Sequence, residues 1–152
     1  MFELMHSISI DAAKGLAHGE AVVPAGHPLF ADHFPSSPLL PGSLLIELAA
    51  QISGPLAEEV SRLRLGLDRW AILGMVRHAR FLRPISLPAT LRFTAEVCRA
   101  RPSSITSKVT VHVGNQQMMR AELLMAMVEA APDWEEAICA RDNRLAQWKG
   151  VL

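Results

Sequence analysis

The sequence is poor in the residues on which several protein classes depend. Its 152 residues include only two cysteines, no tyrosine and 5% aromatic residues, and the formal net charge at pH 7 is zero. Cys98 and Cys139 cannot build a disulfide framework and lack the spacing of a zinc site, so we expect both to be plain buried thiols. The few aromatic residues and the absence of a net positive charge argue against nucleic-acid binding.

Motifs for common chemistries are missing as well. The chain has no HExxH or CxxC motif, no GxSxG motif and no glycine-rich phosphate loop, so we predict no metal site and no nucleotide site. No apolar run reaches the roughly 18 residues of a membrane span, and the N-terminus lacks the pattern of a secretion signal. These absences predict a cytoplasmic protein without a membrane or nucleic-acid partner.

The composition that is present, 50% hydrophobic and 20% charged residues, suits one globular domain over residues 1–152. The hydrophobic pattern predicts two strands, a helix, four strands and a terminal helix, at residues 2–11, 16–24, 42–64, 70–82, 89–100, 104–114, 116–130 and 132–148. The stretch 116–130 has a helix-forming composition, but it follows a Gly-Asn hairpin signal, which favours a strand. An α+β fold, with a mainly antiparallel sheet covered by one helix, fits this order.

The central helix is predicted to be buried. Its first part, "GSLLIELAAQISG" at 42–54, is apolar nearly all round and follows a loop stiffened by prolines. Only Glu47 and Gln51 are strongly polar there, and at a spacing of four residues they share one face. Pro55 is expected to kink or interrupt the helix after Gly54, with a second amphipathic piece continuing to about Arg64.

Glu47 is the first candidate for chemistry because its neighbours in the chain are apolar. An isolated buried carboxyl group is costly to ionise, so we expect a raised pKa and a protonated Glu47. His33 precedes it by 14 residues in the proline-rich loop. A protonated glutamate beside a neutral histidine is an acid and base pair suited to proton transfer. The residues alone leave a second interpretation open, in which His33 binds a backbone carbonyl and Glu47 is a surface acid.

The middle of the chain is rich in arginine. Residues 62–101 contain nine arginines against two acidic residues, which indicates either an acidic partner or a solvated basic face.

The loop and the helix together carry a family resemblance. His33-Phe34-Pro35, Pro38, Pro41-Gly42, Glu47 and Gln51 resemble the signature of the 3-hydroxyacyl acyl-carrier-protein dehydratases. Downstream, "ARFLRP" at 79–84 is similar to that family's ARFKRP segment, and Gly74 falls where its preceding strand has glycine. The resemblance covers about residues 16–130, and glutamate rather than aspartate at position 47 resembles the branch that dehydrates without isomerising.

The resemblance implies a fold and an assembly. The fold is the hotdog fold, a curved antiparallel sheet wrapped around one long buried helix, to which this chain adds a C-terminal helical extension at 132–148. Family members form homodimers or assemblies of dimers, with the active site between subunits. On that analogy His33 of one subunit faces Glu47 of the other.

The reaction implied is dehydration of a (3R)-3-hydroxyacyl thioester on acyl carrier protein to the trans-2-enoyl thioester, with no cofactor of its own. His33 would take the proton from C2, and Glu47 would protonate the departing hydroxyl group. The remaining roles implied by the resemblance are a thioester-oxygen donor at Gly42, an orienting amide at Gln51, a substrate tunnel lined by Phe34, Leu39, Leu40 and Leu44, and a carrier-protein docking surface at Arg77, Arg80 and Arg83.

Departures from the family pattern leave alternatives open. Ser36 and Asp32 stand where glycines are usual, and the 132–148 helix is an addition, so fatty-acid synthesis and a specialised acyl or polyene pathway both remain. A hotdog acyl-thioester hydrolase would not need the histidine loop. A partner subunit in a heteromeric dehydratase is the third alternative.

Overall fold

A six-stranded antiparallel sheet organises the chain in the computed structural model, which describes residues 4–30, 32 and 36–150. The strands lie in the order β1-β2-β4-β5-β6-β3, so β1 and β3 form the two edges. Their bounds are β1 Met5–Asp11, β2 Leu16–Val23, β3 Trp70–Phe81, β4 Ala89–Arg101, β5 Ser104–Val113 and β6 Gln116–Val128. All six strands predicted from the sequence are confirmed, including the one at 116–130.

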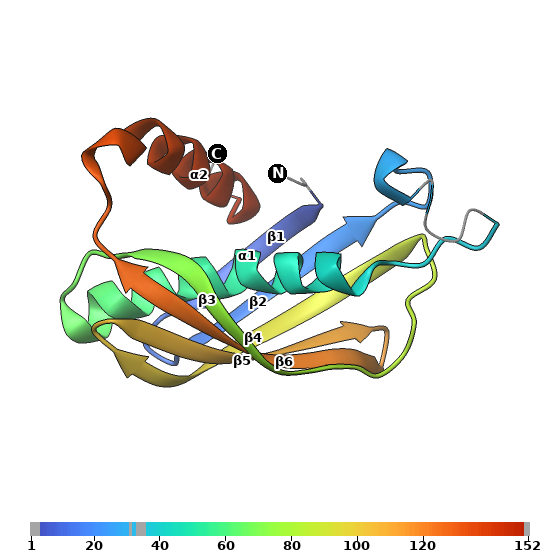
Figure 1. Ribbon diagram of the computed structural model, residues 1–152, viewed down its shortest axis with the longest axis horizontal. Coiled ribbons are helices and arrows are strands. Elements are labelled where there is room, and N and C mark those ends of the chain that lie inside the picture. Colours follow the sequence, from blue (N-terminus) through green and yellow to red (C-terminus); the bar gives the residue numbers. More distant parts are fainter. Residues whose placement is uncertain (1–3, 31, 33–35, 151–152) are drawn as a thin grey trace.

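One face of the sheet curves around helix α1, which spans Gly42–Val60 (Figure 1). Alternate residues of the central strands point toward this helix, because side chains of a strand alternate between its two faces. In β4 these are Leu91, Phe93 and Ala95, all 1% exposed or less. On α1 they meet side chains such as Leu48 and Ile52, which are fully buried. This arrangement is the hotdog fold that the sequence predicted.

The expected interruption of α1 at Pro55 is wrong. The helix runs through Pro55 to Val60 and continues into a π-helical turn, η2, at Ser61–Leu65. Pro55 lacks the N–H that would bond the Gln51 carbonyl, but this loss is small beside the burial of Ile52, Leu56 and their neighbours on both sides of it. Tertiary packing therefore overrides the local preference.

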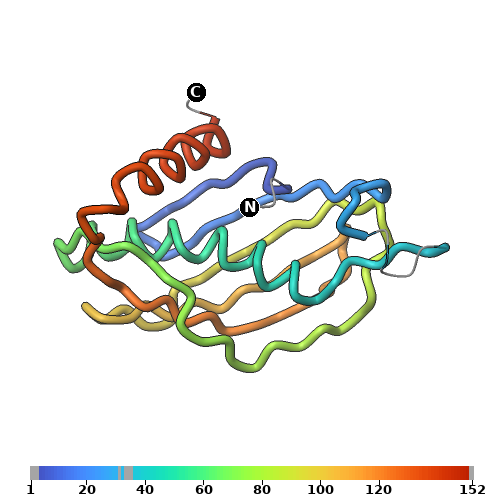
Figure 2. The backbone as a smooth tube through the Cα atoms, turned by 45° about the horizontal axis from the view of Figure 1, so that its top comes forward, coloured from blue at the N-terminus to red at the C-terminus, as the bar shows by residue number. Residues whose placement is uncertain are grey.

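The C-terminal helix is confirmed at the predicted place. A 3-10 turn, η3 at Pro132–Trp134, leads into α2 at Glu135–Trp148, and another, η1 at Pro28–Phe30, lies in the long loop before α1. Helix α2 lies on the same side of the sheet as α1, near the last turns of α1 and strand β1 (Figure 2). Its Leu145 and Trp148 pack against the core.

The expectation of buried cysteines is wrong, since Cys98 and Cys139 are both exposed and unpaired. Cys98 lies beside the bulge of β4 between Val97 and Arg99, which turns its side chain away from the core. Cys139 lies on the outer face of α2. Among the described residues, no helix is long and apolar enough to cross a membrane.

Candidate active site

Glu47 and Gln51 meet on α1 as their spacing predicted. The Gln51 Nε2 atom donates a hydrogen bond of 3.0 Å to Glu47 Oε1. Both side chains are half-buried, so Glu47 is not the isolated carboxyl group that its apolar sequence neighbours suggested. The reason is that Leu44, Leu45, Leu48 and Ala49 are buried in the core, whereas Glu47 lies on the side of α1 that faces a cavity.

A cavity of about 200 Å³ opens at this pair. Its wall comes from α1, from the start of β3, from one β6 residue and from the last turns of α2. The lining residues include Glu47, Ala50, Gln51, Gly54, Pro55, Trp70, Leu73, Met125, Arg144 and Trp148. Sequence reasoning missed the contributions of Trp70 and α2, because no local pattern links residues so far apart in the chain.

Gln51 also presents an unmatched acceptor at this place. Its Oε1 atom is buried and has no hydrogen-bond partner among the described residues. A buried amide oxygen without a partner is unfavourable by about 1–3 kcal/mol. A ligand with a hydroxyl or N–H group would therefore find an acceptor beside Glu47.

The N-terminal turn of α1 lies at a second cavity, of about 370 Å³, between Leu40, Gly42 and the end of β3. The amides of Leu44 and Leu45 both donate to the Pro41 carbonyl, at 3.1 and 3.3 Å. The Gly42 amide, one residue before the first full turn, has no backbone acceptor in the described chain. Free amides at a helix N-terminus favour a negatively charged oxygen.

A close approach favours glycine at position 42. A Cβ atom there would lie 3.0 Å from the ring of Phe81, tighter than ordinary contact. Phe81 itself is half exposed, so the ring forms a wall beside the amide rather than a part of the core.

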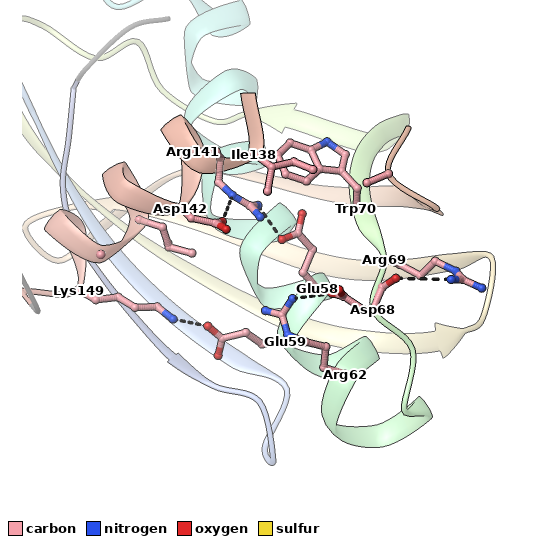
Figure 3. A pocket seen from close by; sticks show the side chains of 13 residues that line it. Glu58, Glu59, Arg62, Asp68, Arg69, Trp70, Ile138, Arg141, Asp142 and Lys149 are labelled. Atoms are coloured by element: carbon pink, nitrogen blue, oxygen red, sulfur yellow. Dashed lines mark hydrogen bonds and ion pairs between the residues drawn. The ribbon is translucent and has the colours of Figure 1, made fainter. Parts of the chain in front are cut away.

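A second glutamate, Glu58, lies about three turns further along the same face of α1. It is 2% exposed, and Arg141 of α2 pairs with its Oε2 at 2.6 Å (Figure 3). The Ala71 amide donates to its Oε1 at 3.0 Å. Burial raises the pKa of Glu58 above its usual value, and the Ala71 amide and Arg141 only partly oppose this. The Arg141 guanidinium also stacks on Trp70, 4.3 Å from the ring centroid.

Of the other predicted site residues, Leu40 and Arg83 line the second cavity together with Gly42. Leu40 and Leu44 are buried in the core cluster, and Leu39 forms an isolated bridge with Ser86. Arg77, Arg80 and Arg83 are exposed along β3 and just beyond it. His33 and Phe34 lie outside the described residues. Among the described residues, no group of three His, Cys, Asp or Glu side chains could hold a metal ion.

Sequence comparison places the chain beside known enzymes. The model of the FabA-like domain family matches residues 1–122. The 3-hydroxyacyl acyl-carrier-protein dehydratase FabZ of Caulobacter vibrioides is 34% identical over 115 residues, which are 75% of this chain and 71% of that protein.

Solved structures share the fold at low sequence identity. The dehydratase heterocomplex ApeI:P from Xenorhabdus doucetiae superposes with a TM-score of 0.67 and 14% identity, covering 89% of this chain and 88% of that one. The thioesterase HI1161 from Haemophilus influenzae gives a TM-score of 0.59 and 14% identity, covering 80% and 78%. At these identities the comparison supports the architecture alone.

Proposed function

Because this chain belongs to the FabA-like family, we propose that it dehydrates 3-hydroxyacyl thioesters carried on acyl carrier protein to trans-2-enoyl thioesters. The observation that carries the proposal is the 34% identity to a FabZ dehydratase over 75% of the chain. The Glu47 and Gln51 pair at a cavity supports it from the structure. The reaction is reversible, so hydration of an enoyl thioester reports on the same site.

Glu47 is the proposed acid. Gln51 donates to its Oε1, which leaves Oε2 to carry the proton toward the cavity. The neutral amide of Gln51 bonds a carboxylic acid as well as a carboxylate, whereas a cation would hold the group ionised. An acid that must give up a proton and regain it in each turnover fits the neutral partner.

His33 is the proposed base, on the strength of the family resemblance. The C2–H bond breaks as His33 takes the proton, and its electron pair forms the new C2–C3 double bond. The bond between C3 and the hydroxyl oxygen breaks, and the hydroxyl group leaves as water after it takes the proton from Glu47. Negative charge builds on the thioester oxygen meanwhile, and the Gly42 amide at the start of α1 is its proposed donor.

The proposed assembly is a dimer joined at strand β3. This edge strand exposes a run of large apolar side chains, namely Ile72, Leu73, Met75, Val76 and Phe81. An exposed apolar edge is a surface that soluble chains cover by pairing. In such a dimer His33 of one subunit would face Glu47 of the other, and exposed Arg77, Arg80 and Arg83 would meet the acidic carrier protein.

Two alternative functions can be tested separately. A thioester hydrolase, as the name of the structural neighbour HI1161 suggests, would release a free thiol without an enoyl product. A subunit of a heteromeric dehydratase would be inactive alone and gain activity with a second hotdog chain. Fatty-acid synthesis and a specialised acyl or polyene pathway remain equally compatible, and a cytoplasmic location stays a prediction.

The test is hydration of crotonyl and longer enoyl thioesters by the purified chain, with a thiol reagent present to report hydrolysis. We expect 3-hydroxyacyl product without thiol release, and loss of product in the His33→Ala and Glu47→Gln variants. Retention of near-normal activity by either variant would refute the roles given to that residue. Thiol release without hydration would instead support the hydrolase.

A further inference from the structure

We propose that helix α2 is a movable cover of the Glu47 cavity, attached largely by ion pairs, and that it lifts to admit an acyl thioester. This inference rests on the proposed function, because it takes the ligand of the cavity to be an acyl thioester. Helix α2 contributes Arg141, Arg144 and Trp148 to the lining of the cavity. Glu47 and Gln51 of α1 line the same cavity, so α2 lies beside the proposed acid.

The cavity is small for that ligand while α2 is in place. Its volume is about 200 Å³, whereas pockets that enclose small molecules usually measure about 300–1,000 Å³. A pantetheine thioester with an acyl chain therefore needs more room than this cavity offers. The walls that come from α1, β3 and β6 are parts of the sheet and of its buried helix. Helix α2 is thus the wall that can move without disrupting the core.

Apolar contacts attach α2 only weakly. None of its 14 residues is buried, whereas most of α1 is. Leu145 and Trp148 are the α2 side chains that pack against the core, and both are partly buried. A cavity of about 570 Å³ also lies between α2 and the end of α1, with Ile138 on one side and Glu59 on the other. Because hydrophobic stabilisation is proportional to the apolar area removed from water, these contacts contribute little to the docking of α2.

Ion pairs supply much of the remaining attachment (Figure 3). Arg141 pairs with Glu58 at 2.6 Å, and Lys149, directly after α2, pairs with Glu59 of α1. The Lys149 and Glu59 side chains are 29% and 24% exposed, so dissolved salt screens their attraction. Salt does not weaken the burial of apolar surface in the same way. An attachment of this kind should therefore loosen as the salt concentration rises.

The segment before α2 offers a hinge. Residues 129–131 join β6 to η3 without regular secondary structure. Trp134 of η3 contacts Trp70 of β3 at a centroid distance of 6.5 Å, which keeps the base of the segment attached to the sheet. Hinges are commonly a few loop residues that absorb the change in backbone angles. A rotation at 129–131 would carry Trp148, at the opposite end of α2, away from Glu47.

A cover affects substrate capture more than the chemical step. A ligand that binds only the open form has its apparent affinity reduced by the fraction of molecules that are open. The value of kcat/KM therefore depends on how firmly α2 is attached, whereas kcat at saturating substrate does not. This difference distinguishes a cover from a helix that only stabilises the fold.

The first test tethers α2 to α1. Glu59→Cys and Lys149→Cys are combined with Cys98→Ser and Cys139→Ser, and a short bismaleimide with a reducible disulfide in its spacer joins the two introduced thiols. We expect kcat/KM for hydration of crotonyl and decenoyl pantetheine to fall about tenfold or more on tethering and to recover when a reductant cuts the spacer. The same sample before and after reduction is the matched control, because every substitution is present in both.

The second test weakens the attachment without a tether, and it covers the case in which the tethered variant fails to fold. Lys149→Met removes the ion pair with Glu59, so kcat/KM should rise by up to about fivefold while kcat stays the same. Raising salt from about 0.05 to about 0.5 M should raise kcat/KM of the unchanged chain, and less so in Lys149→Met. Lys14→Met is the matched control, since Lys14 pairs with Asp11 and does not line the Glu47 cavity.

Binding of decanoyl pantetheine, measured by calorimetry, repeats the tether test without any reaction and separates the two proposals. A tethered chain that binds and hydrates acyl pantetheines as well as the reduced chain overturns the cover and leaves the proposed function standing. A chain that hydrates no enoyl thioester, but binds decanoyl pantetheine more tightly after reduction, overturns the function and supports the cover. Binding in neither state overturns the cover, as does a lower kcat/KM in folded Lys149→Met.

Discussion

Two glutamates on one face of α1 have opposite surroundings. Glu47 is half-buried and accepts a hydrogen bond from the neutral amide of Gln51 at 3.0 Å. Glu58, about three turns further on, is 2% exposed and held by Arg141 at 2.6 Å and by the Ala71 amide. Both carboxyl groups line the same cavity, but among the described residues the recorded partner of the first is a neutral amide, whereas the second is paired with a cation. The comparison teaches that the charge of its partner, in addition to its burial, separates a candidate acid from a structural anchor.

The largest effect is expected from removing the proposed acid. Glu47→Gln keeps the shape of the side chain but removes the transferable proton, and general acid catalysis contributes about 10²–10⁴-fold. We expect kcat for crotonyl thioester hydration to fall by that factor, with an unchanged melting temperature.

The matching substitution of Glu58 tests the different roles given to Glu47 and Glu58. Glu58→Gln should lower the melting temperature and leave kcat for crotonyl thioester close to that of the unchanged chain. If Glu58→Gln abolishes turnover in a folded protein while Glu47→Gln does not, the assignment of the two roles is reversed.

Removing Arg141, the cation that pairs with Glu58, is expected to lower the free energy of unfolding. Arg141→Met leaves Glu58 buried without its ionic partner, and such a loss costs about 3–5 kcal/mol of unfolding free energy. Denaturant unfolding of the two proteins at pH 8 measures the difference. A change below about 1 kcal/mol would show that the pair contributes little to the docking of α2.

The loss of stability in Arg141→Met should depend on pH, and the change with pH should be smaller than the loss itself. Burial raises the pKa of Glu58 in the folded chain, so the folded state binds more protons than the unfolded state above the usual pKa. Stability is therefore highest below the unfolded pKa and falls as pH rises through the folded value. Arg141→Met raises the folded pKa further, so we expect its destabilisation to be greater at pH 8 than at pH 5. Equal losses at both pH values would contradict this.

The smallest effect is expected at the neutral partner of Glu47. Gln51→Met removes one hydrogen bond, which contributes about 0.5–1.5 kcal/mol, so kcat should fall by roughly tenfold or less. Gln51→Lys sharpens the comparison, because a cation beside Glu47 favours the carboxylate over the protonated acid, so kcat should fall further than in Gln51→Met. Measurement of kcat for both variants distinguishes these effects, and an equal kcat in the two would contradict the neutral-partner argument.

Much of the fold could be predicted from the sequence because its signals are local. Apolar residues at every second position predicted the strands, and the apolar segment that begins at Gly42 forms the buried helix α1. The interruption at Pro55 was wrong because helix burial outweighed one missing hydrogen bond. The cysteine burial was wrong because a bulge in β4 and the outer face of α2 decided it.

The candidate site divides in the same way. The spacing of Glu47 and Gln51 on a helix predicted their contact, because residues four apart lie on one face. The Phe81 ring beside Gly42 is set by the pairing of β3 with the rest of the sheet, which a single segment does not encode. The partnership of Glu58 with Arg141 joins residues 83 positions apart, so composition showed only that both types were present.

The sequence by itself determined the order of elements, the burial of α1, the Glu47 and Gln51 pair and the family to which the chain belongs. These follow from short-range spacing and from motifs within single segments. Only the tertiary structure decided what surrounds each carboxyl group: it placed α2 over the end of α1, gave Glu58 its cation and left Glu47 half-buried beside Gln51 at a cavity. The physical reason is that burial and electrostatic environment depend on which distant segments pack together, and a pKa or a cavity exists only after that packing has formed.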